Sequence, residues 1–212
     1  MSEIQLQAGV SALLNLAVLA AVTLAVLSRF PAVEDGKSRF RHGAKTFRYF
    51  TTDSNLLAAL LFPFRLRTLF GGAAALPVWA LTLKYVAVCA VTLTLLTVLC
   101  FLAPTQGWGK MYGRSNLWLH LICPLLCILS FLFTDGGTPL PFSATFAALI
   151  PMGLYGAVYL AEVILIGTDR GGWKDFYGFN RGGKWFVSLP LMLGVSYLIA
   201  LGQWALSGAI WR

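Results

Sequence analysis

Charged residues are scarce in this chain. Asp, Glu, Lys and Arg make up 11% of its 212 residues, whereas an average soluble domain contains about 25%. Hydrophobic residues make up 58%, and several stretches approach or exceed the ~20 apolar residues that a transmembrane helix needs. These stretches lack the alternating polar face of a helix in a soluble core. The composition therefore excludes an ordinary soluble domain and predicts an all-α integral membrane protein.

The sequence also lacks the motifs of the commonest competing enzymes. It contains no Gly-x-Ser-x-Gly elbow, no His-Glu-x-x-His zinc motif and no glycine-rich phosphate loop. Only two histidines are present, so the cysteines have few partners for a zinc site. The cysteines all fall in apolar stretches, at Cys89, Cys100, Cys123 and Cys127. We therefore expect buried thiols, no metal and no other cofactor.

The apolar stretches predict a bundle of six transmembrane helices in a single domain that covers residues 1–212. The expected spans are about 9–28, 49–69, 80–103, 115–134, 142–167 and 185–210. Lys84 leaves two alternatives for the third span: the helix starts near Trp79 with Lys84 at the interface, or it starts at Tyr85. In the second span, Arg65 and Arg67 are expected to extend to the membrane surface.

Basic residues are unevenly divided between the two sides of this predicted bundle. Twelve Lys and Arg residues follow the first, third and fifth spans, and four lie on the other side. Because positively charged loops stay in the cytoplasm, both termini are predicted on the non-cytoplasmic side. The net charge of +8 comes from these loops, which we expect to lie at a membrane surface. We therefore expect a membrane and no nucleic acid as partner.

Polar residues interrupt three apolar stretches at one predicted depth, close to the cytoplasmic leaflet. Polar groups in lipid are costly unless they have a partner or a function, so such a cluster indicates a functional site. The residues are Thr51, Thr52, Asp53 and Asn55 at the start of the second span, Asn116 and His120 in the fourth, and Glu162 at the end of the fifth. Tyr155 and Tyr159 share one face of the fifth span with Glu162.

Each group also has a structural alternative. Thr52 and Asp53 are typical N-capping residues at a helix start. His120 could be a hydrogen-bonded residue of the helix packing, and Glu162 could form a salt bridge or lie at the interface. In the functional interpretation, a threonine hydroxyl is the nucleophile and the neutral imidazole accepts its proton.

Two short windows of the sequence resemble a known family. Phe50-Thr51 followed by Asn55-Leu56-Leu57, and Asn116-Leu-Trp-Leu-His120 with Pro124 downstream, resemble the androgen-induced-protein-like multi-pass membrane family. Its animal members are threonine hydrolases of fatty acid esters of hydroxy fatty acids. The aromatic stretch around Phe176-Tyr177 is similar to a later family segment, although Gly178 stands where a proline is expected.

The resemblance implies a metal-independent intramembrane ester hydrolase with a lipid or fatty acid ester as substrate. Thr51 would be the nucleophile and His120 the base. Because the spacing after the threonine differs by one residue from the animal pattern, Thr52 stays open as the nucleophile. Positioning or oxyanion roles would fall to Asn55, Asn116, Thr52 and Asp53, and the substrate pocket to Tyr155, Tyr159 and Glu162.

The alternative function is a small-molecule or lipid transporter or binding protein that uses the same polar cluster. It would depend on Asp53 and Glu162 as the charges that bind a proton or head group. Transporters usually contain internal repeats and paired broken helices, and the sequence shows neither. A purely structural membrane protein is a third option. The sequence does not indicate an oligomeric state.

Overall fold

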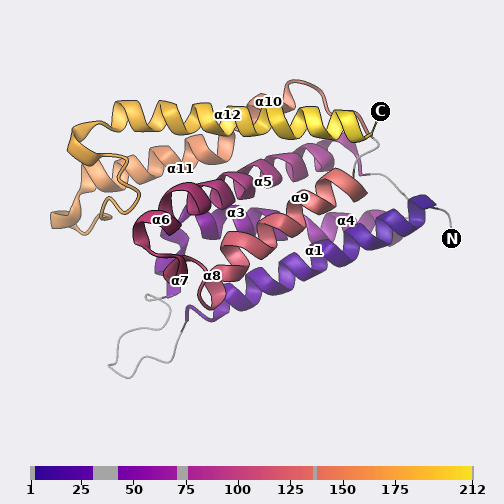
Figure 1. Cartoon of the computed structure of the whole chain (residues 1–212), viewed down its shortest axis with the longest axis horizontal. Helices are drawn as coiled ribbons and strands as arrows, with labels where there is room; N and C mark the ends of the chain where they lie inside the picture. The colour runs from indigo at the N-terminus through magenta and orange to yellow at the C-terminus, as the bar shows by residue number, and fades with distance from the viewer. Residues whose placement is uncertain (1–2, 31–42, 71–75, 136–137, 212) are drawn as a thin grey trace.

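The computed structural model describes residues 3–30, 43–70, 76–135 and 138–211, and all regular elements among them are helical. The long helices lie beside one another in an elongated bundle (Figure 1). Five helical stretches are long and apolar enough to cross a membrane: Gln5–Leu27, Val78–Gln106, Ser115–Thr134, Ala144–Ile166 and Trp185–Ile210. The predicted all-α membrane architecture is thereby confirmed, and these stretches agree closely with five of the expected spans.

The remaining expected span, about 49–69, is divided into two short helices. Helix α3 covers Phe50–Ala59 and helix α4 covers Phe62–Phe70. Pro63 has no backbone N–H to donate to the carbonyl of Ala59, four residues earlier, so one continuous helix would lose a hydrogen bond here. The chain turns at Leu60 and Leu61 instead. The count of six spans is therefore not confirmed.

The other elements follow in chain order and include three π-helical segments. Before α3 lie α1 (Glu3–Leu27) and the 3₁₀ turn η1 (Ala44–Arg48). After α4 come α5 (Val78–Thr97), π-helical η2 (Val98–Leu102), α6 (Ala103–Gln106), α7 (Trp108–Met111), α8 (Ser115–Leu117), π-helical η3 (Trp118–Ile122) and α9 (Cys123–Thr134). The last are α10 (Ala144–Ala147), α11 (Ile150–Leu160), π-helical η4 (Ala161–Ile166), the 3₁₀ turns η5 (Thr168–Arg170) and η6 (Arg181–Gly183), and α12 (Trp185–Ile210).

Helix α5 forms the centre of the bundle. It packs against α3 and α9 on one side and against α12 on the other. Tyr85 on α5 is fully buried and packs against the ring of Phe131 on α9. Its hydroxyl donates to the carbonyl of Ala200 on α12 over 2.6 Å. A buried tyrosine with a satisfied hydroxyl thus joins three long helices.

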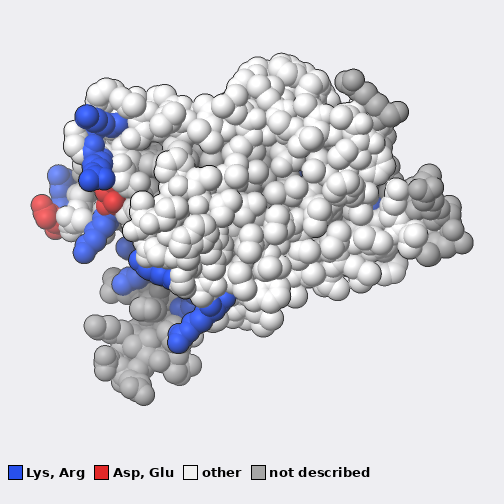
Figure 2. Space-filling view, in the orientation of Figure 1, with Lys and Arg blue, Asp and Glu red and all other residues white. Residues whose placement is uncertain are grey.

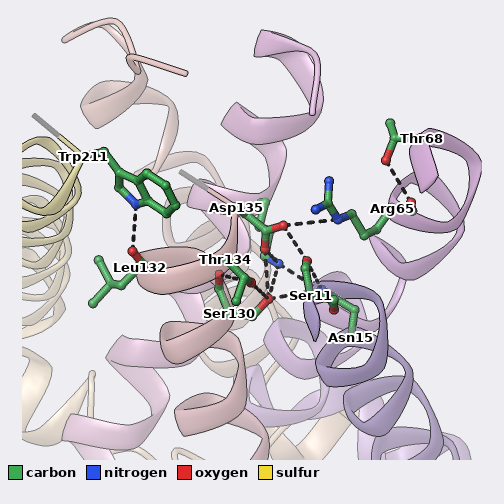
Figure 3. Close-up of polar contacts among 10 residues, drawn as sticks. Ser11, Asn15, Arg65, Thr68, Ser130, Leu132, Thr134, Asp135 and Trp211 are labelled. Atoms are coloured by element: carbon green, nitrogen blue, oxygen red, sulfur yellow. Dashed lines mark hydrogen bonds and ion pairs between the residues drawn. The ribbon is translucent and has the colours of Figure 1, made fainter. Parts of the chain in front are cut away.

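A buried ionic network joins α1, α4, α5 and the end of α9 (Figure 3). The carboxylate of Asp135 pairs with Lys84, lies 3.4 Å from Nε of Arg65, and accepts a hydrogen bond from Ser11. Lys84 also donates to Ser130 over 2.7 Å. Helix α5 starts at Val78, which agrees with the expected start near Trp79 and not with a start at Tyr85. Lys84 is 3% exposed and lies inside the bundle.

The predicted surface position of Arg65 is wrong. Its side chain is 2% exposed and lies beside Asp135 inside the bundle, whereas Arg67 on the same helix is exposed. A buried arginine needs a carboxylate to offset its desolvation, and Asp135, seventy residues later in the chain, provides it. This long-range pairing could not be inferred from the local sequence.

The two ends of the bundle differ in charge. Figure 1 places both chain termini at one end. Figure 2 shows the visible Lys and Arg side chains gathered at the opposite end, over α6, α7, α8 and the segment between α11 and α12. Lys37, Arg39 and Arg41, which the sequence assigns to the first cytoplasmic loop, lie outside the described residues. The basic end carries the site described next.

Candidate functional site

Three π-helical segments occur in the part of the bundle near its basic end. A π-helical turn displaces one backbone hydrogen bond and re-aims side chains, and it occurs frequently at functional sites. Segment η2 contributes Val98 and Leu102 to cavities at this end, and η3 carries His120. Segment η4 carries Glu162. Irregular backbone thus surrounds the place where the polar residues gather.

A polar cavity of about 360 Å³ brings four predicted site residues together: Thr51, Thr52, Asn116 and His120. They come from α3, α8 and η3, which packing against α1 and α5 holds side by side. The rest of the lining is formed by Arg29, Tyr49, Leu102, Gln106, Lys110, Met111, Phe176 and Tyr177. Four of the residues that the sequence places at one depth therefore line one space.

A second, mainly apolar cavity of about 30 Å³ also borders Thr51. The two cavities share Thr51, Leu102 and Tyr177 as lining residues. The other walls of the apolar cavity come from α3, α5, η2, α11, the segment between η5 and η6, and α12: Phe50, Leu93, Thr94, Thr97, Val98, Met152, Tyr155, Phe179 and Met192. Thr51 thus borders both a polar space and an apolar one.

His120 is buried and its ring is fixed by a single backbone contact. Nδ1 lies 2.6 Å from the carbonyl oxygen of Met111. Since a carbonyl can only accept, Nδ1 carries the proton in this contact, and the neutral imidazole keeps its lone pair on Nε2. This is the tautomer that a general base requires. In this structure no direct hydrogen bond joins His120 to Thr51, and catalytic hydrogen bonds often form only when substrate is bound.

Asn55 is fully buried one turn after Thr51. Its amide nitrogen donates to the carbonyl of Thr51 over 2.7 Å and to the carbonyl of Leu119 over 2.9 Å. Leu119 precedes His120 in η3. Both amide hydrogens are therefore used in joining the two site segments, so the geometry fits the positioning role that the sequence suggested for Asn55 and leaves no hydrogen for an oxyanion.

The start of α3 has no side-chain cap. Its N-cap residue is Tyr49, which makes no side-chain capping hydrogen bond. The hydroxyl of Thr52 lies 3.1 Å from that of Thr46 in η1, and Asp53 borders a different hollow on the side of α11. The capping alternative considered for Thr52 and Asp53 is thus not seen. The backbone N–H groups of Thr52 and Asp53 donate to the carbonyl of Tyr49, so only the first two amides of α3 lack a backbone acceptor in this turn.

Asn116 organises the mouth of the polar cavity. Its carbonyl oxygen accepts a hydrogen bond from Nη2 of Arg29 over 2.5 Å, and its amide donates to the carbonyl of Lys110 over 2.9 Å. The backbone of Met111, and not Asn116, fixes the imidazole of His120. Asn116 therefore joins Arg29, just after the end of α1, to α7 at the cavity.

Sequence reasoning did not name Tyr177 as a site residue. Its hydroxyl interacts with the side chain of Thr51, the hydroxyl of Tyr155 and the backbone N–H of Phe50. Burial raises the pKa of this hydroxyl to about 12, although its contacts with Tyr155, Phe50 and Thr51 lower that pKa. The group is therefore a neutral donor at the start of α3.

The loop that carries Tyr177 is held in place by two residues. The hydroxyl of Tyr159 accepts from the backbone N–H of Tyr177 over 2.9 Å and donates to Asp175 over 2.9 Å. The other carboxylate oxygen of Asp175 accepts from the backbone N–H of Asn180 over 3.0 Å. The aromatic residues after the fifth span were the only sequence signal for this loop.

The remaining predicted pocket residues lie in different places. Tyr155 lines the apolar cavity and donates to the carbonyl of Arg48 over 2.8 Å. Tyr159 is fully buried behind the loop that it supports. Glu162 lies in η4 and lines neither cavity. Of this group, only Tyr155 directly borders the space next to Thr51.

Metal coordination finds no support in the part of the chain that the structure describes, because no three His, Cys, Asp or Glu side chains there could hold an ion together. Cys89, Cys123 and Cys127 are buried free thiols, and Cys100 is exposed. Comparisons of this chain with protein-family models, with curated proteins and with solved structures find no match.

Proposed function

We propose that this protein is an intramembrane hydrolase of fatty acid esters, with Thr51 as nucleophile and His120 as general base. The observation that carries the proposal is the position of Thr51, whose side chain borders both the polar cavity of His120 and an apolar cavity. An ester of a fatty acid has a polar reacting centre and an apolar chain. The polar cavity of about 360 Å³ suits the reacting centre, and the apolar cavity of about 30 Å³ marks where the chain would enter but has to widen to hold it.

The chemistry needs only side chains at this site. The hydroxyl oxygen of Thr51 attacks the ester carbonyl while Nε2 of His120 accepts the hydroxyl proton. The tetrahedral oxyanion then collapses, the leaving alcohol takes the proton from His120, and an acyl-threonine remains. Water attacks this ester with His120 again as base. The fatty acid departs, and the proton returns to Thr51.

The developing oxyanion has two sources of hydrogen bonds. One is the hydroxyl of Tyr177, which stands beside Thr51 and stays protonated. The other is the backbone N–H of Thr51, at the positive end of the ten-residue helix α3. The next two N–H groups, of Thr52 and Asp53, already donate to the carbonyl of Tyr49. Preorganised donors in a site that excludes water are commonly the largest contribution to acyl transfer.

Thr51 fits the role of the nucleophile better than Thr52 does. Thr52 is 1% exposed and its hydroxyl contacts the hydroxyl of Thr46. Thr51 borders both cavities and contacts Tyr177. The transporter alternative depends on Asp53 and Glu162, and neither residue lines the two cavities next to Thr51.

The site lies at the basic end of the bundle, and we propose that this end faces the cytoplasm. Positively charged loops favour the cytoplasmic side, and Figure 2 shows the Lys and Arg side chains at the end opposite the termini. The active site would then open near the cytoplasmic leaflet, with both termini on the other side. Fatty acid esters of hydroxy fatty acids are the substrate class that the family resemblance suggests.

The test measures fluorophosphonate labelling and ester turnover by the purified protein in detergent. Thr51→Ala is expected to abolish both, and His120→Ala to lower turnover by about 10²- to 10⁴-fold, the usual contribution of a general base. Thr52→Ala is expected to keep labelling. Thr145→Ala is the matched control, because Thr145 is a buried threonine whose hydroxyl bonds to its own segment at Phe142. Unlabelled, inactive and well-folded wild-type protein would overturn the proposal.

A further inference from the structure

An open groove of about 1010 Å³ runs along α1 toward the basic end of the bundle. Its wall on α1 is formed by small side chains that recur every three or four residues and so share one helix face. They are Ala17, Ala20, Ala21 and Ala25, with Ser28 at the end, and Leu24 is the one large side chain on this wall. The opposite wall comes from α7, α8 and the start of η3, including Trp118. Small residues on one wall leave room for an elongated apolar ligand.

The length of the groove corresponds to one membrane leaflet. From Ala17 to Ser28 the helix rises about 16 Å, at ~1.5 Å per residue. The hydrocarbon core of a bilayer is ~30 Å thick, so the groove covers about half of it. The groove ends where α1 ends, at Leu27, which is also where the basic residues begin.

Three cations line that end of the groove: Arg29, Lys110 and Arg114. Neither of the two ion pairs formed by the described residues includes any of them. Arg29 donates to Asn116, but its buried Nε has no hydrogen-bond partner among the described residues. Burial lowers the pKa of Arg29, which shows that this cation has lost part of its hydration. The basic end of the groove thus favours an anion.

We propose that this groove binds one anionic glycerophospholipid of the adjacent leaflet. The phosphate would lie against Arg29, Lys110 and Arg114, and an acyl chain would lie along the alanine face of α1. Basic pockets between transmembrane helices are suited to anionic head groups, which attract each nearby Lys or Arg. A zwitterionic lipid would offer the same chains but no net negative charge.

The bound head group would stand at the mouth of the site cavity. Arg29, Lys110 and Asn116 line both the groove and the polar cavity of Thr51 and His120. The lipid would therefore occupy the lateral approach to that cavity from the membrane. Binding in the groove involves no bond cleavage, so it does not depend on the hydrolase proposal.

The test uses purified protein in nanodiscs that contain phosphatidylglycerol with a photoactivatable acyl chain. Mass spectrometry of the crosslinked peptides locates the label, and phosphatidylcholine with the same acyl chain is the control lipid. We expect phosphatidylglycerol to label residues 17–28 preferentially. The double variant Lys110→Gln/Arg114→Gln should lower this labelling by about fivefold for each charge removed, the size of the attraction of one basic residue to anionic lipid.

Two matched controls make the result specific. Arg181→Gln/Lys184→Gln removes two charges from the loop before α12, outside the groove, and should change labelling less than about twofold. Ala21→Phe fills the groove without changing charge and should abolish labelling of residues 17–28. Ala157→Phe, on an exposed position of α11, should not.

Two results would overturn the proposal. One is equal labelling of residues 17–28 by the two lipids. The other is an equal loss in both double variants, which would mean general attraction to the membrane surface without a defined site. Thr51→Ala should label like the wild type, so loss of hydrolysis and loss of lipid binding are separated in the same set of proteins.

Discussion

The side-chain amide of Asn55 on α3 donates to the backbone carbonyl of Leu119 in η3 over 2.9 Å. Its other hydrogen goes to the carbonyl of Thr51 over 2.7 Å. A single buried side chain thus connects the turn that carries Thr51 with the residue that precedes His120. The relative position of the proposed nucleophile and base depends on these two bonds.

Asn55→Leu should therefore lower turnover and stability together. Leucine has a similar size but no N–H, so the carbonyl of Leu119 would lose this donor at a cost of about 1–3 kcal/mol. The carbonyl of Thr51 would still accept from the hydroxyl of Ser54. We expect a lower melting temperature in detergent and a lower kcat with little change in KM. Both are measured on the same preparation, by intrinsic fluorescence during heating and by ester turnover.

A matched variant separates positioning from stability. Tyr85→Phe removes the buried hydrogen bond to Ala200 at the centre of the bundle, away from the site. It should lower the melting temperature and leave kcat close to the wild-type value. If Asn55→Leu loses no more activity than Tyr85→Phe, Asn55 has only a structural role.

Tyr177→Phe tests the proposed oxyanion donor. The substitution removes the hydroxyl beside Thr51 and keeps the ring that packs between Tyr159 and Phe179. Loss of one preorganised donor typically lowers kcat by about 10²- to 10³-fold. We expect such a decrease without a comparable loss in the final extent of fluorophosphonate labelling.

The control for Tyr177 is Tyr197→Phe, because the ring of Tyr197 stacks on Phe146 on another face of the bundle. It should keep the wild-type kcat. Equal kcat values for Tyr177→Phe and the wild type would exclude the hydroxyl from the reaction.

The pH dependence at alkaline pH provides an independent test of Tyr177. Burial raises the pKa of its hydroxyl to about 12, above the ordinary tyrosine value near 10. The neutral form is thus favoured by folding, and the stability that it contributes is complete below pH ~10 and is lost as the pH rises through about 12. Ultraviolet difference spectra at 295 nm, compared between wild type and Tyr177→Phe, should show no ionisation of this tyrosine near pH 10.

Composition and hydropathy were sufficient to predict the helical membrane class and most helix positions. Trp185–Ile210 and Ser115–Thr134 agree with two expected spans, because long apolar stretches have few alternatives in lipid. The second expected span is not confirmed as one helix, because its hydropathy was considered without the break before Pro63. The burial of Arg65 and Lys84 could not be predicted for another reason. Their partner Asp135 lies at least 51 residues away in the chain, and only the fold reveals this pairing.

The sequence also indicated which polar residues meet, but not how each is used. Thr51 and His120 shared a predicted depth, and both line one cavity. The tautomer of His120 depends on the carbonyl of Met111, and a backbone carbonyl leaves no trace in residue type. Tyr177 depends on Tyr159 and on Asp175 of its own loop. No periodicity or residue spacing in the sequence indicates how the fold positions the side chain of such a loop residue.

The buried ionic network at the other end of the bundle predicts an asymmetric effect of removing its charges. Asp135→Asn removes the carboxylate that offsets Lys84 and contacts Arg65. Breaking a buried ion pair by removing one partner costs about 3–5 kcal/mol. Lys84→Met removes one cation but leaves Asp135 beside Arg65, with hydrogen bonds from Ser11 and Ser130, so it should cost less.

Thermal unfolding in detergent distinguishes these variants. We expect the melting temperature to fall most for Asp135→Asn, less for Lys84→Met and least for Arg67→Gln, since Arg67 is exposed on the same helix as Arg65. Equal decreases in melting temperature for Asp135→Asn and Lys84→Met would show that the carboxylate contributes no more to the stability of the network than Lys84 does. The asymmetry is expected because one carboxylate faces two cations. Removing the carboxylate leaves two buried positive charges uncompensated, whereas removing one cation leaves the carboxylate paired with the other.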